Sequence, residues 1–403
     1  MEWWTQVITA GRTAFVLFLA LAAFAAGPAV AGRIADAWPD RILIANPSRA
    51  LEAHLSAGGF GLESVERLDA LGLSLMVAEP PRGVPGADAV RQLRAMFPAA
   101  IIARDDPFYL ATDARAGRGK FSDRRRVLKS IGWQTDGANA GAGIRIGVID
   151  SSVDPAHPAL QGALIVKRSF TSGKAPTTDT AHGTAIATML VGQSDGATIA
   201  GLLRGATLLH AGIFQKSKSG PMASSADFLR AVDWMVDSGV TVINASVTSP
   251  TENAVVLFAM SMLSHEDVIL VAAAGNRGPD GPPAYPAAID SAFAVTAVSL
   301  DGDAYRHANT GDYIDIAAPG IDLPTTSRRI TSGTSLAVPF VTAAVARMVQ
   351  TCGITPVEAE KRLQANARDL GPRGRDPRFG WGLLQAPRCA APQLSVRHPS
   401  STR

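Results

Sequence analysis

Short apolar runs alternate with helix-like stretches from about Ile131 onward. Runs that are apolar at nearly every position are typical of strands buried on both faces, and strands that alternate with helices indicate parallel βαβ units. We therefore predict an α/β fold with a mostly parallel sheet and helices on both faces. The runs are Ile144–Ile149, Leu208–Ile213, Val240–Asn244, Val268–Ala274 and Ala292–Val298.

The composition narrows the class of protein. Of the 403 residues, 47% are hydrophobic and 18% are charged, which suits a large packed core and excludes a disordered chain. The formal net charge is only +3, so bulk charge does not favour nucleic-acid binding. The basic cluster Arg124–Arg126 has no interleaved aromatic residues, and we interpret it as part of an exposed linker.

A small α+β unit is expected before the parallel sheet, over residues 32–111. The pattern predicts strand, helix, strand, strand, helix and strand, which is the split βαβ order. The predicted elements are Arg41–Ala45, Ser48–Ala57, Ser64–Leu68, Ser74–Val77, Ala87–Met96 and Ala100–Ala103. Residues 112–130 are polar and basic and predict an exposed linker that proteases can reach. The main domain then spans 131–390, and we expect a disordered tail at 391–403.

The N-terminal residues predict an export signal over 1–31. Arg12 is followed by the apolar run Ala14–Ala26, and then by Gly27, Pro28 and the small-residue cleavage pattern Ala29–Ala31. The apolar core is shorter than the roughly 20 residues that a bilayer span needs. An uncleaved membrane anchor is the alternative. The mature protein is expected to be secreted or periplasmic, without a stable membrane span.

The chain has two cysteines, Cys352 and Cys389, which flank the last predicted helix. Export would permit a disulfide that fastens the C-terminal end of the fold. Two unpaired buried thiols are the alternative that the sequence leaves open.

Four polar residues occupy the strand ends or helix starts where α/β folds collect their functional groups. Asp150 ends a predicted strand, and His182 opens an apolar helix. Ser335 lies at the start of a mostly apolar helix, and Asn276 follows a buried strand. Each residue alone has an ordinary structural explanation, as a turn, a cap or a buried polar group. Together they predict a nucleophilic serine, a histidine base, an orienting carboxylate and an oxyanion donor.

The segments around these residues resemble the signatures of the subtilisin-like serine proteases, or subtilases. The resemblance covers about Ile131 to Ala386, and the chain order Asp, His, Ser differs from the Ser, Asp, His order of α/β-hydrolase esterases. The segments are Ile149-Asp150-Ser151, His182-Gly183-Thr184, Ala273-Ala274-Gly275-Asn276 and Ser332-Gly333-Thr334-Ser335-Leu336-Ala337-Val338-Pro339.

The resemblance implies a serine endopeptidase that works through an acyl-enzyme. Asp150, His182 and Ser335 would form the catalytic triad, and Asn276 would help to bind the oxyanion. The segment Val242–Thr248 resembles the substrate-binding strand of the family, to which an extended peptide would add. The residues implied in substrate binding are Ser246, Val247, Thr248, Ala273 and Ala274.

The N-terminal unit resembles a subtilase propeptide, which implies synthesis as a zymogen with the propeptide as an intramolecular inhibitor. The partners expected are therefore protein or peptide substrates and the chain's own propeptide, without nucleic acid. A permanent accessory domain is the alternative for this unit. For the whole chain, the alternative is a catalytically silent binding protein on a subtilase scaffold.

Several positions depart from the family pattern. Ser152 stands where a glycine is frequent, and Ala185 and Thr188 stand where the histidine helix often carries His and Gly. Ala159 occupies a position at which many members have a calcium-binding Asp. Because a hard oxygen ligand is missing there, we expect no high-affinity calcium site, no other metal site and no cofactor.

Overall fold

The computed structural model describes residues 38–111, 123–134, 140–172, 176–177, 179–193, 199–218, 220–263, 267–326 and 330–389. The predicted export signal, residues 112–122 of the predicted linker and the predicted tail lie outside these ranges.

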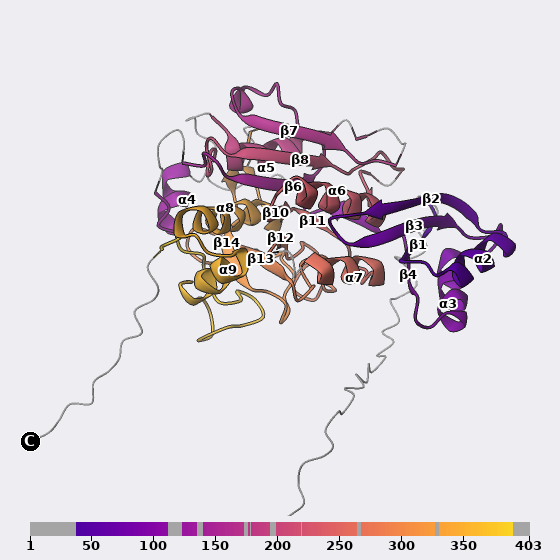
Figure 1. Cartoon of the computed structure of the whole chain (residues 1–403). Helices are drawn as coiled ribbons and strands as arrows, with labels where there is room; N and C mark the ends of the chain where they lie inside the picture. The colour runs from indigo at the N-terminus through magenta and orange to yellow at the C-terminus, as the bar shows by residue number, and fades with distance from the viewer. Residues whose placement is uncertain are drawn as a thin grey trace, which may run out of the picture. The chain divides into compact units, whose positions relative to one another are not determined.

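A seven-stranded sheet forms the centre of the main domain (Figure 1). Every neighbouring pair in it is parallel, which confirms the predicted architecture. The strands in spatial order are β14 (Ile316–Pro319), β13 (Ala292–Val298), β12 (Ile269–Ala273), β10 (Val242–Ala245), β6 (Arg145–Asp150), β8 (Thr207–Gly212) and β7 (Leu164–Ser169).

Helices bury both faces of this sheet. One core cluster joins alternate residues of the strands, such as Val148 and Val271, to helices α5 (Ala181–Val191) and α8 (Thr334–Cys352). A second cluster joins the opposite residues, such as Ile149 and Leu270, to helices α6 (Ser225–Asp237) and α7 (Ala254–Leu263). The apolar runs of the sequence follow from this double burial, because side chains alternate between two apolar layers.

The five predicted strands correspond to β6, β8, β10, β12 and β13, whereas β7 and β14 were not predicted. The two missing strands form the edges of the sheet. Strand β7 (LIVKRS) carries charged residues and is mostly exposed, and β14 is short, so neither has a long apolar run.

The N-terminal unit has the predicted order of elements and forms an antiparallel sheet in the order β2-β3-β1-β4. Its own core lies between that sheet and two helices. Ser48 caps the first helix, since its side chain accepts a hydrogen bond from the Leu51 N–H. The elements are β1 (Ile42–Ala45), α2 (Arg49–Ala57), β2 (Gly61–Leu68), β3 (Leu73–Glu79), α3 (Gly86–Met96) and β4 (Ile101–Arg104).

The C-terminal part of the predicted linker is a helix, which corrects that prediction. Helix α4 spans Arg124–Ser130, and Val127 and Leu128 are buried in the main core cluster. Asp123 caps it by accepting a hydrogen bond from the Arg125 N–H. The sequence pattern did not predict this helix because Arg124–Arg126 are polar and only one face of the helix is apolar. The last element, helix α9 (Pro356–Ala365), packs on α8.

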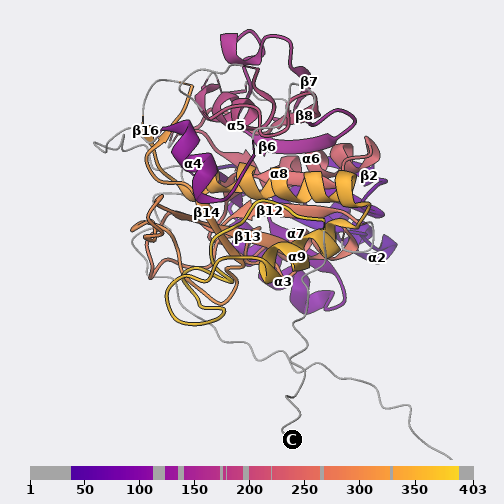
Figure 2. The ribbon, with the colours of Figure 1, turned by 90° about the vertical axis from the view of Figure 1, so that its left-hand side faces the viewer.

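Helix α8 passes through the middle of the domain and contacts β10, β12, β13 and β14 (Figure 2). Among the described residues it is the one helix long and apolar enough to cross a membrane, and 72% of its most apolar window is buried. Burial in a protein core accounts for the apolar character of α8 equally well.

A disulfide joins Cys352 to Cys389, as one of the two alternatives predicted. The bridge connects the C-terminal end of α8 to the last described residue across a sequence separation of 37. It holds the final segment against the domain.

Loss of this disulfide is expected to lower the free energy of unfolding. A cross-link that closes a loop of this length contributes up to about 4 kcal/mol by restricting the unfolded chain. Denaturant unfolding of Cys352→Ser/Cys389→Ser should therefore show a lower midpoint than that of the oxidised protein. A midpoint that does not change would mean that the bridge fastens only a segment that frays independently.

Candidate active site

Asp150 and His182 come together at the carboxyl edge of the main sheet. Asp150 is the last residue of β6 and is fully buried, and His182 is the second residue of α5. The His182 Nδ1 atom lies 2.6 Å from Asp150 Oδ1. The same carboxylate oxygen accepts a hydrogen bond from the Ser151 N–H at 2.6 Å. A carboxylate held in this way can fix the tautomer and orientation of the imidazole.

A second histidine lies behind this pair. His210 of β8 is fully buried, and burial lowers its pKa to about 4 although the charge of Asp150 raises it. The ring is therefore neutral near pH 7. As a result, His210 does not compete with His182 as a positive charge beside Asp150.

Ser335 lies in the first turn of α8, where helix geometry leaves backbone N–H groups unpaired. Its Oγ atom is buried and has no hydrogen-bond partner among the described residues. The Nε2 atom of His182 is likewise buried and without a partner there. Helices α5 and α8, which carry the two residues, contact each other. No hydrogen bond joins Nε2 to Oγ, and such catalytic contacts often tighten only when a substrate binds.

Asn276 follows β12, and its amide is held in one orientation. The Oδ1 atom accepts hydrogen bonds from the Thr334 N–H at 3.1 Å and from Thr334 Oγ1 at 3.0 Å. Thr334 Oγ1 in turn accepts a hydrogen bond from the Gly275 N–H. Because Oδ1 is fully used as an acceptor, the Nδ2 donor faces the opposite way. Thr334 was not singled out from the sequence, although it lies within the serine motif.

A segment of the N-terminal unit pairs with two strands beside these residues. Strand β5 (Pro107–Leu110) lies between β11 (Val247–Thr248) and β9 (Ala223–Ser224), and both pairings are antiparallel. Leu110 pairs with Val247 and Tyr109 with Thr248. The Ala111 N–H continues the ladder by donating to the Ser246 carbonyl oxygen at 3.1 Å. Three of the predicted substrate-binding residues, Ser246, Val247 and Thr248, thus bind an extended peptide of the same chain.

The carbonyl oxygen of Ala111 lies beside Asn276 and Ser335. Asn276 Nδ2 donates to it at 2.6 Å. A Cβ atom placed on Gly333 would lie 3.2 Å from this oxygen, 3.3 Å from Asn276 Nδ2 and 3.4 Å from Ser335 Oγ. The carbonyl, the amide donor and the serine hydroxyl therefore surround one point, and a side chain at residue 333 would crowd it. Ala111 was not predicted as a site residue, because nothing in the sequence shows which bond would lie there.

The remaining predicted residues have less specific surroundings. Ala273 and Ala274 are fully buried, and Ala273 packs in the main hydrophobic core. Their place in substrate binding stays a prediction. Within the described ranges, no group of three His, Cys, Asp or Glu residues could hold a metal ion.

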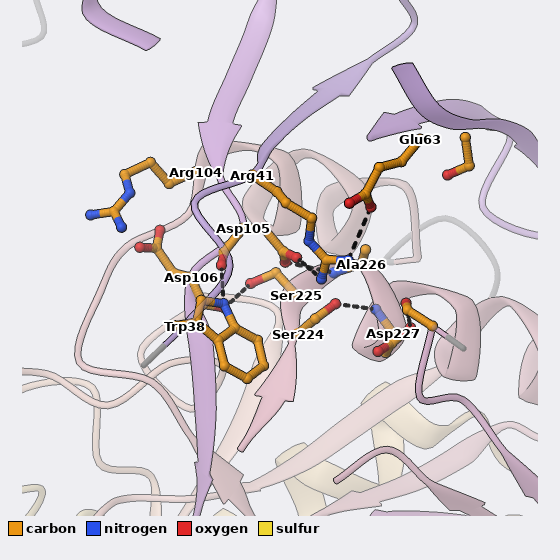
Figure 3. Close-up of polar contacts among 12 residues, drawn as sticks. Trp38, Arg41, Glu63, Arg104, Asp105, Asp106, Ser224, Ser225, Ala226 and Asp227 are labelled. Atoms are coloured by element: carbon orange, nitrogen blue, oxygen red, sulfur yellow. Dashed lines mark hydrogen bonds and ion pairs between the residues drawn. The ribbon is translucent and has the colours of Figure 1, made fainter. Parts of the chain in front are cut away.

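Polar contacts fasten β5 and its unit to the main domain (Figure 3). Arg41 of the N-terminal unit forms an ion pair with Asp105, and both side chains are buried. Asp105 also accepts a hydrogen bond from the Ala226 N–H, at the start of α6. Close by, the Ser225 hydroxyl donates to the Asp106 carbonyl oxygen at 2.8 Å. These contacts set the register in which β5 runs toward Ser335.

Asp227, also in the first turn of α6, contributes to the same interface. Its Oδ1 lies 2.8 Å from Arg230 Nη1, and Arg230 pairs with Glu66 of β2 at 2.6 Å. Burial raises the pKa of Asp227 to about 6, although Ser172 and Arg230 lower it. Burial likewise raises the pKa of Asp106 to about 6, against the opposing charge of Arg104.

The raised pKa of Asp227 predicts a pH dependence of stability. A carboxyl whose pKa is raised in the folded state binds its proton more tightly there, so folding is favoured at low pH. This contribution is complete below about pH 4 and is lost as the pH rises through 6. Between pH 4 and 7, the melting temperature of an uncut Asp227→Asn chain should therefore fall less than that of an uncut chain that retains Asp227. Parallel curves for the two chains would contradict the prediction.

The chain is similar in sequence to a family of known proteins. The model of the Subtilase family matches residues 141–382, which is more than half of the chain. The minor extracellular protease Epr of Bacillus subtilis (strain 168) is 30% identical over 250 residues, which are 61% of this chain and 38% of that protein. Subtilisin Savinase of Lederbergia lenta is 30% identical over 255 residues, covering 61% of this chain and 90% of that protein.

Solved structures agree on the fold. The crystal structure of fervidolysin from Fervidobacterium pennivorans, described as a keratinolytic enzyme related to subtilisin, matches with a TM-score of 0.68 and 21% identity. That match covers 87% of this chain and 60% of fervidolysin. The protease domain of PatA matches with a TM-score of 0.54 and 27% identity, covering 62% of this chain and 95% of that domain.

Proposed function

Because the chain belongs to the subtilase family, we propose that it is an exported serine endopeptidase that is made as a zymogen. The single observation that carries the proposal is the hydrogen bond from Asn276 Nδ2 to the Ala111 carbonyl oxygen, beside the Ser335 hydroxyl. A peptide carbonyl polarised next to a buried serine hydroxyl is the geometry that acyl transfer requires. Export rests on the pattern of residues 1–31 and is supported by the name of the extracellular relative Epr.

The proposed chemistry follows from the atoms at this point. His182 takes the proton of the Ser335 hydroxyl while Oγ bonds to the peptide carbonyl carbon. Asp150, 2.6 Å from the imidazole, stabilises the imidazolium that forms. The Asn276 amide and the Ser335 N–H stabilise the oxyanion. The carbon–nitrogen bond then breaks, His182 returns the proton to the leaving amine, and water hydrolyses the serine ester.

The first substrate proposed is the chain itself. Ala111 presents its carbonyl to the site, so the bond to be cut lies between Ala111 and Thr112. Cleavage there would free residues from 112 onward as the mature enzyme. The strand that ends at Ala111 would remain paired with β9 and β11 and would block the cleft until the N-terminal unit leaves.

The intact mass of the purified protein after exposure to a fluorophosphonate probe tests both parts of the proposal. A fragment that begins at Thr112 and gains one probe mass is expected, whereas Ser335→Ala should stay uncut and unlabelled. A labelled fragment with a different N-terminus would support the endopeptidase activity and contradict the proposed cleavage between Ala111 and Thr112.

A catalytically silent binding protein on the same scaffold is the alternative. Asp150, His182, Asn276 and Ser335 are all present, which favours the enzyme. An uncut chain that stays unlabelled even after limited nicking of residues 112–122 by trypsin would favour the silent protein.

A further inference from the structure

The Ser335 carbonyl group cannot receive the hydrogen bond that a regular helix would give it. In an α-helix, each carbonyl oxygen accepts from the N–H group four residues later, and four residues after Ser335 comes Pro339, which has no N–H. A buried carbonyl group without a donor costs free energy, so a donor from elsewhere is favoured. The Ser246 hydroxyl donates to this carbonyl oxygen from outside the helix, at 3.2 Å.

Two further side chains fix the direction of this hydroxyl. Asn244 Nδ2, which can only donate, lies 2.9 Å from Ser246 Oγ, so Ser246 accepts from it and turns its own hydrogen toward Ser335. Asn244 Oδ1 accepts in turn from the Thr342 hydroxyl at 3.3 Å. Asn244, Ser246 and Thr342 are all fully buried, so water does not compete for these hydrogen bonds. The hydrogen bonds therefore run in one direction, from Thr342 to the Ser335 carbonyl oxygen.

These hydrogen bonds attach helix α8 to one segment of the chain at two points. Thr342 follows Ser335 by seven residues, which is nearly two whole turns, so the two residues lie on the same side of the helix, about 10 Å apart along its axis. Asn244 belongs to β10, which lies between β6 and β12 in the main sheet. Both the rotation of α8 and its position along its own axis are therefore set against the sheet.

Ser246 also contacts the bound peptide through its backbone. Its carbonyl oxygen accepts the Ala111 N–H at 3.1 Å, while its hydroxyl donates to the Ser335 carbonyl oxygen. One residue thus contacts both the serine that would attack and the residue whose carbonyl group would be attacked. An error of about 1 Å in such an arrangement can lower a reaction rate about 100-fold.

We infer that Ser246 is a positioning residue, whose hydroxyl holds Ser335 in the place from which it attacks a peptide bound to the Ser246 backbone. Asn244 and Thr342 keep that hydroxyl directed at Ser335. Pro339 belongs to the same arrangement, because it leaves the Ser335 carbonyl oxygen to a donor outside the helix. The inference rests on the proposed function, since it concerns the same serine and the same bound peptide.

Hydrolysis of a peptide and of an ester by Ser246→Ala tests the inference. The fluorogenic parent peptide carries residues 106–115, and the ester is p-nitrophenyl acetate, which is too small to pair with a strand. Every enzyme is released from the full chain after trypsin has nicked it within residues 112–122, and trypsin is removed before the assay. Since the backbone of residue 246 still binds the peptide, kcat should decrease about 10- to 100-fold with KM within about twofold. Hydrolysis of the ester, whose position does not depend on the strand, should decrease less than about threefold.

Ser130→Ala is the matched control. The Ser130 hydroxyl donates to the Val127 carbonyl oxygen of α4 at 2.7 Å, so this substitution also removes a serine hydroxyl that donates to a carbonyl group of a helix. The control should hydrolyse both substrates as the unsubstituted enzyme does. A decrease equal to that of Ser246→Ala would show that the loss of any such hydroxyl impairs the enzyme, and it would overturn the inference.

Thr342→Val tests the same hydrogen bonds with Ser246 in place. It removes the hydroxyl that donates to Asn244 Oδ1 and keeps the Ser246 donor to Ser335. Because Asn244 is then held less firmly, kcat for the peptide should decrease by less than in Ser246→Ala, and by more than kcat for the ester. A peptide kcat equal to that of the unsubstituted enzyme would overturn the orienting role of Asn244 and Thr342.

A double variant separates the position of Ser335 from the need of its carbonyl oxygen for a donor. In Ser246→Ala/Pro339→Ala, the alanine introduced at position 339 supplies a backbone N–H from within α8. The carbonyl oxygen is then paired again, but no hydrogen bond from residue 246 holds the helix. The peptide kcat should therefore stay as low as in Ser246→Ala. Recovery of the original kcat would mean that the carbonyl oxygen needs only a donor, and the positioning role would be overturned.

Two further outcomes separate this inference from the proposed function. An equal decrease for peptide and ester in Ser246→Ala would mean that the serine itself is impaired, which would overturn the inference and leave the endopeptidase intact. Failure of the unsubstituted enzyme to hydrolyse the peptide, the ester and unfolded casein would instead remove the proposed function, and the inference with it.

Discussion

Replacement of Ser335 by alanine is expected to lower kcat by about 10⁶-fold and to leave the melting temperature unchanged, when both proteins have been nicked by trypsin within residues 112–122. The loss is large because the proposed covalent route disappears with the hydroxyl. The stability should persist because Ser335 Oγ has no hydrogen-bond partner among the described residues, so its removal breaks no hydrogen bond there. Kinetics on a peptide substrate and thermal unfolding of the same preparation measure the two quantities.

Non-additivity provides the control for Ser335→Ala. If Ser335 and His182 act as one unit, then His182→Ala alone and the double variant should each lose about as much as Ser335→Ala. A double variant that loses the product of the two single effects would mean that the residues act independently. In that case the proposed triad would not be the catalytic unit.

Asn276→Leu is expected to lower kcat by about 10²- to 10³-fold with little change in KM. The substitution keeps the approximate volume of the side chain and removes the donor that lies 2.6 Å from the Ala111 carbonyl oxygen. Because the oxyanion carries more charge than the carbonyl of the bound substrate, the lost hydrogen bond matters most in the transition state. Steady-state kinetics on the parent peptide provide the test.

Thr334→Val is the companion to Asn276→Leu. It removes the hydroxyl that donates to Asn276 Oδ1 at 3.0 Å and keeps the amide itself. A smaller decrease in kcat, again with KM nearly constant, would indicate that Thr334 orients the donor. If Asn276→Leu raised KM and left kcat alone, Asn276 would bind substrates without stabilising the oxyanion.

Much of the fold could be predicted from the local pattern of apolar and polar residues in the sequence. The five central strands are apolar at nearly every position because helices cover both of their faces, and that signal does not depend on the neighbours being known. The elements of the N-terminal unit could also be predicted, since its two helices are amphipathic and Ser48 caps the first of them. The edge strands β7 and β14 and the helix α4 were not predicted. Strand β7 and helix α4 carry charged residues, and β14 spans only 4 residues.

Some features of the candidate site could likewise be predicted from the sequence, and others could not. The positions of Asp150, His182, Asn276 and Ser335 at strand ends and helix starts could be predicted because such ends are recognisable locally and meet at one edge of a parallel sheet, and their catalytic roles stay a prediction. The structure brings Asp150 and His182 to within a hydrogen bond of each other. The sequence alone left undecided whether the two cysteines form a disulfide, and the structure joins Cys352 to Cys389.

The sequence by itself determined the sheet, the order of the polar residues and the types of side chain at the site, because each depends on residues adjacent along the chain. Only the tertiary structure decided that Ala111 lies at Asn276, that Phe108 stacks on Phe228 and that Arg277 faces Tyr109. These contacts join residues more than a hundred positions apart. Their geometry arises from strand pairing and core packing between two units, which no local pattern encodes.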